Sequence, residues 1–520
     1  MTEATTPRAG WREWAGLAVL ALPTLLVSMD LTVLHLAVPH LTADLSPSGT
    51  QLLWIVDVYG FLVAGLLIPM GTLGDRIGRR RLLLAGATAF GAASALTAYA
   101  TSAEALIAAR ALLGVGGATL MPSTMSLIRT MFRDDRQRTV ALSVWMMSFM
   151  TGGAIGPLVA GVMLDGLWWG SVFLLGVPVM VLLLAAGPFL LPEYRDPAPG
   201  RLDVPSALLS IAAVLSLVSS LKQIAADGLT WEPAVPVLVG LVAGAVFVRR
   251  QLRLDHPLVD VRLFGDRVFT TSLGALLVGI MVMMGLYFLT AQYLQLVEGL
   301  SPLAAGLWTL PSTAAGIVGT MLSPMLVHRL RPAHVISGGL VVAIAGLALL
   351  TQAGTSGLAL IITGSAVLSL GIAPATVLGT DMIVGSAPPE RAGAASALSE
   401  TASELGGALG IAVLGSIGAA AYGGRLTDTI PDRIAPETAD AASDTLGGAV
   451  ETAGQLPERL GAQLLTAAHE AFVHGLHVVA AVGILIMAAF AVSVAVVLRG
   501  RQTTPGQEPA NPSLPEPERR

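Results

Sequence analysis

The segment Gly71-Thr72-Leu73-Gly74-Asp75-Arg76-Ile77-Gly78-Arg79-Arg80-Arg81 separates two long apolar runs, one ending near Met70 and the next beginning at Leu82. It places four Arg and one Asp within eleven residues. Because unpaired polar groups are not tolerated in hydrocarbon, we predict that it forms a tight turn at a membrane surface. Short loops rich in Arg stay on the cytoplasmic side, so this turn fixes the orientation of every other segment.

The composition is that of a protein embedded in a membrane. The chain has 520 residues, of which 54% are hydrophobic and 12% are charged, whereas soluble proteins carry about 25% charged residues. Cysteine is absent, which excludes disulfides, thiolate metal sites and cysteine nucleophiles. The 29 basic residues include a single lysine, Lys222, which we place at an outer helix end.

The hydropathy pattern predicts fourteen membrane-spanning helices, since a helix needs about 20 apolar residues to cross a bilayer. The apolar runs lie at roughly 15–38, 51–70, 82–101, 104–127, 139–163, 170–191, 204–223, 233–248, 269–294, 303–326, 335–353, 357–385, 393–421 and 471–498. An even number of spans places both termini in the cytoplasm. The segments then assigned to the cytoplasm hold 24 of the 29 Lys and Arg residues, as the positive-inside rule requires.

We therefore expect an all-α membrane protein with two six-helix bundles, at 15–191 and 269–498, joined by a linker at 192–268 that contains two inserted helices. The bundles would be parallel repeats. The remaining segments are a cytoplasmic N-terminus at 1–14, an outer loop at 422–468 and a Pro- and Glu-rich, disordered cytoplasmic tail at 499–520.

The opening segment resembles the signature loop G-x-L-x-D-R-x-G-R-R of the major facilitator superfamily. Every motif position is filled, including Gly71, Asp75, Arg76, Gly78 and Arg79. The alternative is a basic loop that only orients the helices. The resemblance implies the major facilitator fold, in which two bundles rock about a central site, with Asp75, Arg76 and Arg79 closing the cytoplasmic side in the outward-open state.

Several kinds of chemistry can be excluded. An ATP-driven pump needs G-x-x-x-x-G-K-[ST], and Lys222 does not stand in such a loop. His469 and His474 are five residues apart, about 140° around a helix, whereas a zinc-protease helix places its two His four apart. We expect no metal, no cofactor, no ATP, no nucleic acid and no enzymatic activity.

Three ionisable residues fall inside predicted spans at similar depth. Asp30, Asp57 and Arg110 lie roughly 9–12 Å below the outer surface at 1.5 Å per residue, and buried charges in membranes are costly and usually functional. A carboxylate and an Arg at one depth can pair. The pair is either a permanent salt bridge that holds helices together or a proton-responsive one that opens when the carboxylate is protonated.

The surroundings of these residues resemble known motifs. Met29–Pro39 is similar to the span-1 motif of the fourteen-span drug:proton antiporters, although His35 stands where that family has Asn. Arg110–Gly117 resembles the span-4 motif, whose Arg is linked to proton coupling. The resemblance thus implies a role in proton coupling for Arg110.

Span 5 contains Gly152, Gly156, Pro157 and Gly161. The Pro removes a helix hydrogen bond, and the glycines permit a kink and close helix packing. The stretch resembles the antiporter motif of exporters, which favours export over uptake. The alternative is a face used only for packing.

Span 13 carries Glu400 and Glu404, four residues apart and thus on one helix face. Glu400 would lie about 10 Å from the cytoplasmic side and Glu404 near mid-membrane. Since like charges repel, at least one is expected to hold a proton. The stretch resembles EmrB/QacA-type pumps for quaternary ammonium compounds and dyes, in which an acidic span-13 residue contacts the drug. Alternatively, Glu400 is a hydrogen-bonded packing residue.

Three further residues are candidates for binding the substrate. Asp381, at the inner end of span 12, matches the same subgroup, although it could instead serve as an interfacial cap. Trp54 and Tyr59 are candidates to line an apolar pocket, although aromatic residues are more often plain packing.

Together these features predict a proton-coupled multidrug antiporter that exports lipophilic cations by alternating access. Its partners would be protons, small drugs and lipid, and it would be a multi-pass monomer in the bacterial cytoplasmic membrane with both termini inside. The alternative transporter is a dedicated antibiotic or metabolite exporter with a neutral or anionic substrate. A different class is a membrane sensor or scaffold that binds a partner through 422–468.

Overall fold

The computed structural model describes residues 9–195, 203–227, 231–254, 257–327, 329–386, 392–430 and 434–497. Within these ranges fourteen helical segments are long and apolar enough to cross a membrane, which confirms the predicted fold class. The tail at 499–520 lies outside the described residues.

The N-terminal bundle consists of α1 (Trp11–Leu45), α2 (Gly49–Ile77), α3 (Arg79–Ala98), α4 (Ala103–Met131), α5 (Asp135–Gly166), α6 (Ser171–Leu174) and α7 (Gly176–Leu190). The inserted helices are α8 (Val204–Asp227) and α9 (Ala234–Gln251), followed by the 3-10 helix η1 (Val261–Gly265). The C-terminal bundle consists of α10 (Arg267–Gln292), the π-helix η2 (Tyr293–Val297), α11 (Pro302–Val327), α12 (Pro332–Leu350), α13 (Leu358–Ser386), α14 (Ala392–Leu409), the π-helix η4 (Gly410–Gly415), α15 (Ser416–Thr429) and α18 (Glu458–Val497). Two short helices, α16 (Pro436–Asp444) and α17 (Leu446–Gln455), lie between α15 and α18.

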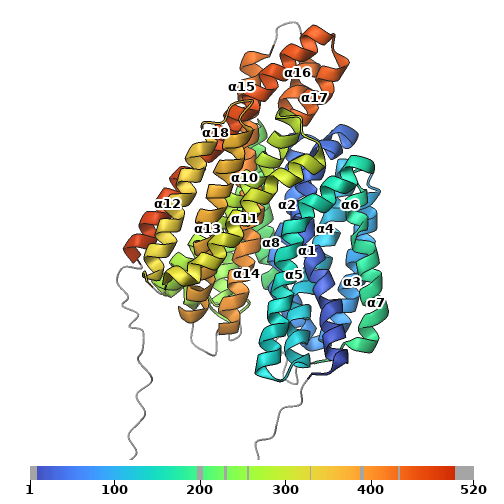
Figure 1. Cartoon of the computed structure of the whole chain (residues 1–520), viewed down its shortest axis with the longest axis vertical. Coiled ribbons are helices and arrows are strands. Elements are labelled where there is room, and N and C mark those ends of the chain that lie inside the picture. The colour runs from blue at the N-terminus through green and yellow to red at the C-terminus, as the bar shows by residue number, and fades with distance from the viewer. Residues whose placement is uncertain are drawn as a thin grey trace, which may run out of the picture.

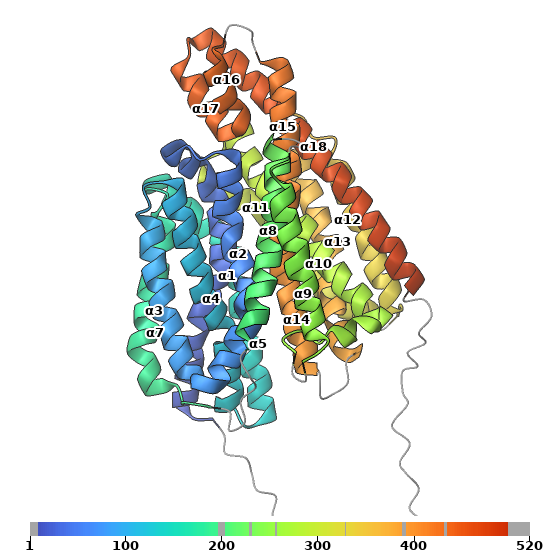
Figure 2. The same ribbon diagram turned by 180° about the vertical axis from the view of Figure 1, so that it is seen from behind.

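The two bundles stand side by side (Figure 1). They approach each other at the end that carries α16 and α17, which we term the outer end, and diverge towards the opposite, inner end. The start of α1 and the end of α18 lie on the inner side, as expected for an even number of spans. Figure 2, the view from behind, shows α8 running between the two bundles on the face that is turned away from the viewer in Figure 1.

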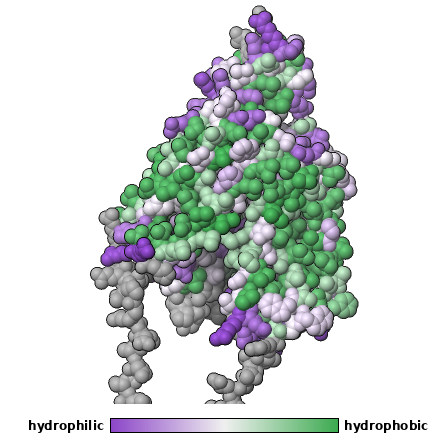
Figure 3. All heavy atoms as spheres, in the orientation of Figure 1, coloured by the Kyte–Doolittle hydropathy of each residue, from purple (hydrophilic) through white to green (hydrophobic). Residues whose placement is uncertain are grey.

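The surface is that of a multi-pass membrane protein. Figure 3 shows a broad apolar area over the helices, with polar residues gathered towards the two ends. Large apolar side chains are exposed on the spanning helices, among them Phe189 at 72%, Met321 at 68% and Leu485 at 71%. A soluble monomer rarely exposes contiguous apolar surface of this extent, whereas lipid accommodates it.

Side-chain caps fix the starts of several spanning helices. Ser48 accepts a hydrogen bond from the Gln51 amide at 3.2 Å, and Asp266 accepts one from the Val268 amide at 2.7 Å. These bonds satisfy backbone donors that the first helical turn leaves free. The helices can therefore end where the polar surface begins.

The predicted turn at 71–81 is much shorter than expected. The helix α2 continues to Ile77, α3 starts at Arg79, and only Gly78 departs from helical geometry, with a φ of 111°. That left-handed value favours glycine. The expectation of an eleven-residue turn was wrong in extent because charged side chains are tolerated at helix ends where they pair, as Asp75 and Arg79 do at 2.5 Å.

Glycines bring the two bundles into backbone contact near the outer end. A methyl group at Gly161 of α5 would lie 2.6 Å from the Leu303 Cα of α11, and one at Gly306 of α11 would lie 2.6 Å from the Pro157 carbonyl oxygen of α5. Neither position leaves room for a side chain. Closure of the outer end in this structure therefore depends on these glycines.

Candidate functional site

A cavity of about 290 Å³ lies between the two bundles. Most of its wall is apolar, and its size suits a small ligand rather than a macromolecule. The polar and aromatic residues that line it are Ser28, Thr32, His35, Asp57, Tyr59, Arg110 and Phe149 from the N-terminal bundle and Ser403 and Glu404 from the C-terminal bundle. Both bundles therefore contribute to one central site.

Arg110 pairs with Asp30, one of the two carboxylates predicted at its depth. Its Nη1 lies 2.8 Å from Asp30 Oδ2, and its Nε donates to the Ile55 carbonyl at 3.2 Å. The guanidinium also lies over the rings of Tyr59 and Phe173, 4.9 and 5.7 Å from their centroids. The side chain is only 2% exposed, so the ion pair and the aromatic faces replace the water that a buried cation loses.

Asp57 pairs with Lys222, a residue for which sequence analysis predicted no role. Its Oδ2 lies 2.7 Å from Lys222 Nζ of α8, and both side chains are completely buried. The Lys222 ammonium also lies 4.1 Å from the centroid of the Trp54 ring. Lys222, expected at an outer helix end, lies near that end of α8, and its pairing with Asp57 adds it to the buried charges Asp30, Asp57 and Arg110. The available signal was that the only lysine of the chain stands within an apolar run.

The acidic residues of span 13 and span 12 differ in position. Glu404 of α14 lines the cavity, and no ion pair to it forms among the described residues. Glu400 lies one helical turn away, in the inner direction, and is half-buried. Asp381 is exposed on α13 and is not among the residues that line the cavity. The structure therefore brings Glu404, and not Asp381, into the site.

The aromatic candidates contact cations of the protein itself. Tyr59 lines the cavity beneath Arg110, whereas Trp54 faces Lys222. His35 makes edge-to-face contacts with Tyr287 and Phe288 of α10, with centroids 5.2 and 5.9 Å apart. His35 thereby joins α1 to the opposite bundle.

The glycine motif of span 5 lies on a continuous α5. Methyl groups at Gly152 and Gly156 would collide with α1, at the Leu25 carbonyl and at Thr32 respectively, while Gly161 contacts α11. The motif therefore packs α5 against a helix of its own bundle and against a helix of the other.

Four of the five charged side chains of the signature segment form ion pairs within the N-terminal bundle, whereas Arg76 is exposed. Asp75 pairs with Arg79, and Glu193, just beyond α7, lies 3.6 Å from Arg80 Nε and 3.6 Å from Arg81 Nε. No ion pair between this segment and the C-terminal bundle forms among the described residues. The inner ends of the bundles are thus not joined by these charges in the present conformation.

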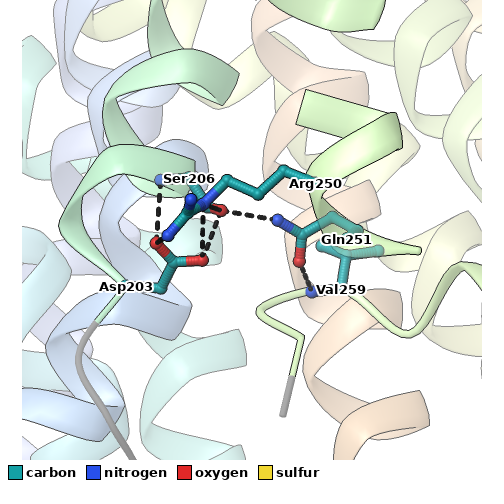
Figure 4. Close-up of polar contacts among 5 residues, drawn as sticks. All are labelled: Asp203, Ser206, Arg250, Gln251 and Val259. Carbon is teal, nitrogen blue, oxygen red and sulfur yellow. Dashed lines mark hydrogen bonds and ion pairs between the residues drawn. The ribbon is translucent and has the colours of Figure 1, made fainter. Parts of the chain in front are cut away.

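A polar network holds the inner ends of α8 and α9 together (Figure 4). Arg250 Nη2 donates to Asp203 Oδ1 at 2.9 Å, the Ser206 hydroxyl donates to Asp203, Gln251 donates to Ser206 Oγ at 2.6 Å, and the Val259 amide donates to Gln251 at 3.1 Å. Burial alone would raise the pKa of Asp203, but the hydrogen bonds from Arg250 and Ser206 outweigh it and lower that pKa. The network connects the inserted helices to the segment that precedes α10.

A charged central cavity enclosed by two membrane-spanning bundles is the architecture of a secondary transporter. A family model described as the Major Facilitator Superfamily matches residues 20–411. The chain belongs to this superfamily, a family of transporters rather than enzymes.

Several curated relatives cover nearly the whole chain. The multidrug efflux pump LfrA of Mycolicibacterium smegmatis is 45% identical over 496 residues, 95% of this chain and 98% of that one. The methyl viologen resistance protein SmvA of Salmonella typhimurium is 36% identical, covering 89% and 94%. The tetracenomycin C resistance and export protein of Streptomyces glaucescens is 33% identical, covering 91% and 90%.

Among solved structures, the chain resembles a bacterial homolog of the human lysosomal transporter Spinster in an inward-facing, unoccupied conformation. The TM-score is 0.68 at 20% identity, over 96% of this chain and all of that one. At this identity the likeness shows the fold alone.

Proposed function

We propose that the protein is a proton-coupled exporter of lipophilic cations, working by alternating access in the bacterial cytoplasmic membrane with both termini inside. One observation carries the proposal: Glu404 lines an otherwise largely apolar cavity without a cationic partner among the described residues. A carboxylate in a medium of low dielectric constant must bind either a proton or a cation. Its chemistry therefore fits a site at which the two compete.

Competition at one carboxylate is sufficient for antiport. On the acidic outer side a proton binds Glu404 and expels the drug, and on the inner side the proton leaves and the carboxylate binds drug again. The coupling is reciprocal: a bound proton lowers the affinity for the drug by a certain factor, and a bound drug lowers the affinity for the proton by the same factor. Glu400, one turn away, would add to the negative potential that attracts the cation. Tyr59 would supply an aromatic face.

We assign proton coupling also to Asp30, Asp57 and Arg110. Arg110 keeps its charge at any physiological pH, so protonation of Asp30 would leave it without an anion and change how α4 packs on α1. Asp75, Arg76 and Arg79 would reach the opposite bundle only when the inner end closes. We do not extend the proposal to Asp381, which is exposed.

The relatives support export and leave two kinds of substrate open. LfrA is a multidrug efflux pump and SmvA confers resistance to methyl viologen, an organic dication, whereas the tetracenomycin C protein exports an antibiotic. The last relative favours the alternative of a dedicated exporter with a neutral or anionic substrate. The unpaired Glu404 favours the cation, since an anion would be repelled from this cavity.

The test is ethidium uptake into inside-out membrane vesicles with an acidified lumen. Wild-type uptake should be abolished by a protonophore and reduced at least tenfold in Glu404→Gln, because the variant lacks the competing charge. Glu232→Gln is the matched control, since Glu232 is exposed and far from α14 in the sequence. Absence of wild-type uptake at any pH gradient would refute the cationic substrate. Uptake of a neutral antibiotic in the same vesicles would then support the alternative.

A further inference from the structure

The only lysine of the chain lies between a carboxylate and an aromatic ring. The Lys222 ammonium lies between the Asp57 carboxylate, at 2.7 Å, and the face of the Trp54 indole, 4.1 Å from its centroid. A carboxylate and an aromatic face are the features by which proteins hold organic ammonium groups. Lys222 therefore stands where an exported cation of the same chemistry could stand.

The site borders the transport cavity on one side only. Asp57 lines the cavity, whereas Lys222 and Trp54 are not among its lining residues. Apart from the ion pair, neither the Asp57 carboxylate nor Lys222 Nζ makes a hydrogen bond to another described residue. A cation in the cavity that pairs with Asp57 would therefore have only the ion pair to Lys222 to displace, and no wider hydrogen-bond network.

We infer that Lys222 is a tethered competitor of the exported cation and an exchangeable proton carrier. When a lipophilic cation enters the cavity and pairs with Asp57, Lys222 is displaced and its ammonium releases a proton. One N–H bond of the ammonium breaks, its electron pair stays on Nζ as a neutral amine, and the proton passes to water. The charge of the site is the same before and after, because one cation replaces one proton. The inference rests on the proposed cation export.

The surroundings favour loss of the proton over persistence of a free ammonium. Next to Lys222 lies an apolar cluster that includes Phe61, Val218 and Ala412, and an unpaired charge in such surroundings is costly. Lysine can lose its proton and arginine cannot. A buried Lys at this position can therefore become neutral when it is displaced from Asp57, whereas an Arg would stay charged.

Within the part of the chain that the structure describes, few other charges act on the pair. Lys222 and Arg110 are the cations that act on Asp57, and Asp57 is the anion that acts on Lys222. Arg110 is itself paired with Asp30, and Glu404 lines the same cavity from α14. Arg425 and Asp428 stand on α15, which packs on α8, while the neighbouring η4 carries no ionisable residue.

The placement of α8 gives the exchange a mechanical consequence. Its inner end is fixed to α9 and to Val259 through Asp203, Ser206 and Gln251 (Figure 4). Near its outer end, Lys222 is the contact with a charged partner on α2. Displacement of Lys222 would remove the ion pair that joins this part of α8 to α2, and would leave the apolar packing of Val218 beside Phe61 as their contact. Binding of a cation at Asp57 would in this way change how the inserted helix α8 contacts the N-terminal bundle.

The experiment uses the fact that Lys222 is unique. Full-length protein grown with lysine labelled by ¹⁵N at Nζ gives a single lysine side-chain NMR signal, whose shift distinguishes an ammonium from a neutral amine. Addition of tetraphenylphosphonium should convert this signal from the ammonium to the amine. In Asp57→Asn, tetraphenylphosphonium should leave the signal unchanged, because the cation no longer competes with Lys222.

Proton release provides the second measurement. In weakly buffered detergent solution, Lys222→Arg should release one proton fewer than the wild type per bound tetraphenylphosphonium and should bind it roughly tenfold or more weakly, because a displaced Arg stays charged. A wild type that binds tetraphenylphosphonium while Lys222 stays an ammonium would overturn this inference alone. A wild type that neither binds it nor transports ethidium would overturn the proposed function, and the inference with it.

Discussion

A single methyl group at Gly306 should open the outer end of the molecule. In Gly306→Ala the new methyl would lie 2.6 Å from the Pro157 carbonyl oxygen and 3.0 Å from its carbon, whereas even close carbon–oxygen contacts need about 3.3 Å. The overlap exists only while α5 and α11 touch. Overpacking of this kind costs about 1–3 kcal/mol, and about 2 kcal/mol corresponds to a roughly 30-fold change in a population ratio. The better helix propensity of Ala acts in both conformations and cancels.

Distances between spin labels report the change directly, and the absence of Cys means that no native thiol interferes. Exposed positions suit the labels: Thr101 with Gln352 at the outer end, and Arg133 with Arg329 at the inner end. Double electron–electron resonance should show a longer outer distance and a shorter inner distance in Gly306→Ala than in its parent.

The matched control lies on α5 itself. Gly166→Ala adds the same methyl group where nothing lies within 4 Å, so both distance distributions should equal those of the parent. If Gly306→Ala likewise left both distributions unchanged, the contact between α5 and α11 would not be what holds the outer end closed. A shift in both variants would point to helix propensity instead.

Two further predictions concern stability, measured as thermal unfolding in detergent. Asp30→Asn should lower the free energy of unfolding by about 3 kcal/mol, the lower end for a broken buried pair, because Arg110 keeps its contacts with the Ile55 carbonyl and two aromatic faces. The double variant Asp30→Asn/Arg110→Gln should lose less stability than the sum of the losses in the two single variants. Strict additivity of the two losses would contradict the pairing. Arg250→Gln should cost about 1 kcal/mol or less, since Arg250 is 40% exposed. The pKa of Asp203 is lowered in the folded state from its ordinary value of 3.8. The stability that the Asp203–Arg250 pair contributes is therefore fully present above pH 3.8 and is lost as the pH falls through the pKa of Asp203 in the folded protein. A difference between wild type and Arg250→Gln that persisted or grew in acid would contradict the assignment.

The number of spans could be predicted because crossing a bilayer requires a fixed length of apolar chain. The extent of the turn at 71–81 could not, because the sequence does not show which charges will pair. Asp75 and Arg79 stand four apart, at helical spacing, and Glu193, more than a hundred residues away, meets Arg80 and Arg81. These pairs let α2 continue, and α3 begin, within residues that hydropathy alone assigns to a loop.

The membership of the charge cluster could be predicted only in part. Position along a helix gives depth, and depth alone predicted that a carboxylate could pair with Arg110, as Asp30 does. It cannot give the direction of a side chain around the helix axis or the identity of the neighbouring helix. Asp57 is directed to α8, an inserted helix whose place between the bundles no pattern in the sequence indicates, and so its partner Lys222 was missed.

Under the proposed mechanism, the two ion pairs would respond differently to transport. Asp30 and Arg110 both belong to the N-terminal bundle, so a rigid rocking of the bundles leaves them together, and protonation of Asp30 is what can separate them. Asp57 and Lys222 join that bundle to an inserted helix, so relative motion, a proton or a competing cation can each separate them. A pump needs one element that senses pH and one that senses its cargo. We therefore propose that the pair within one bundle responds to protons, and that the pair between the bundle and α8 responds to protons and to the cargo.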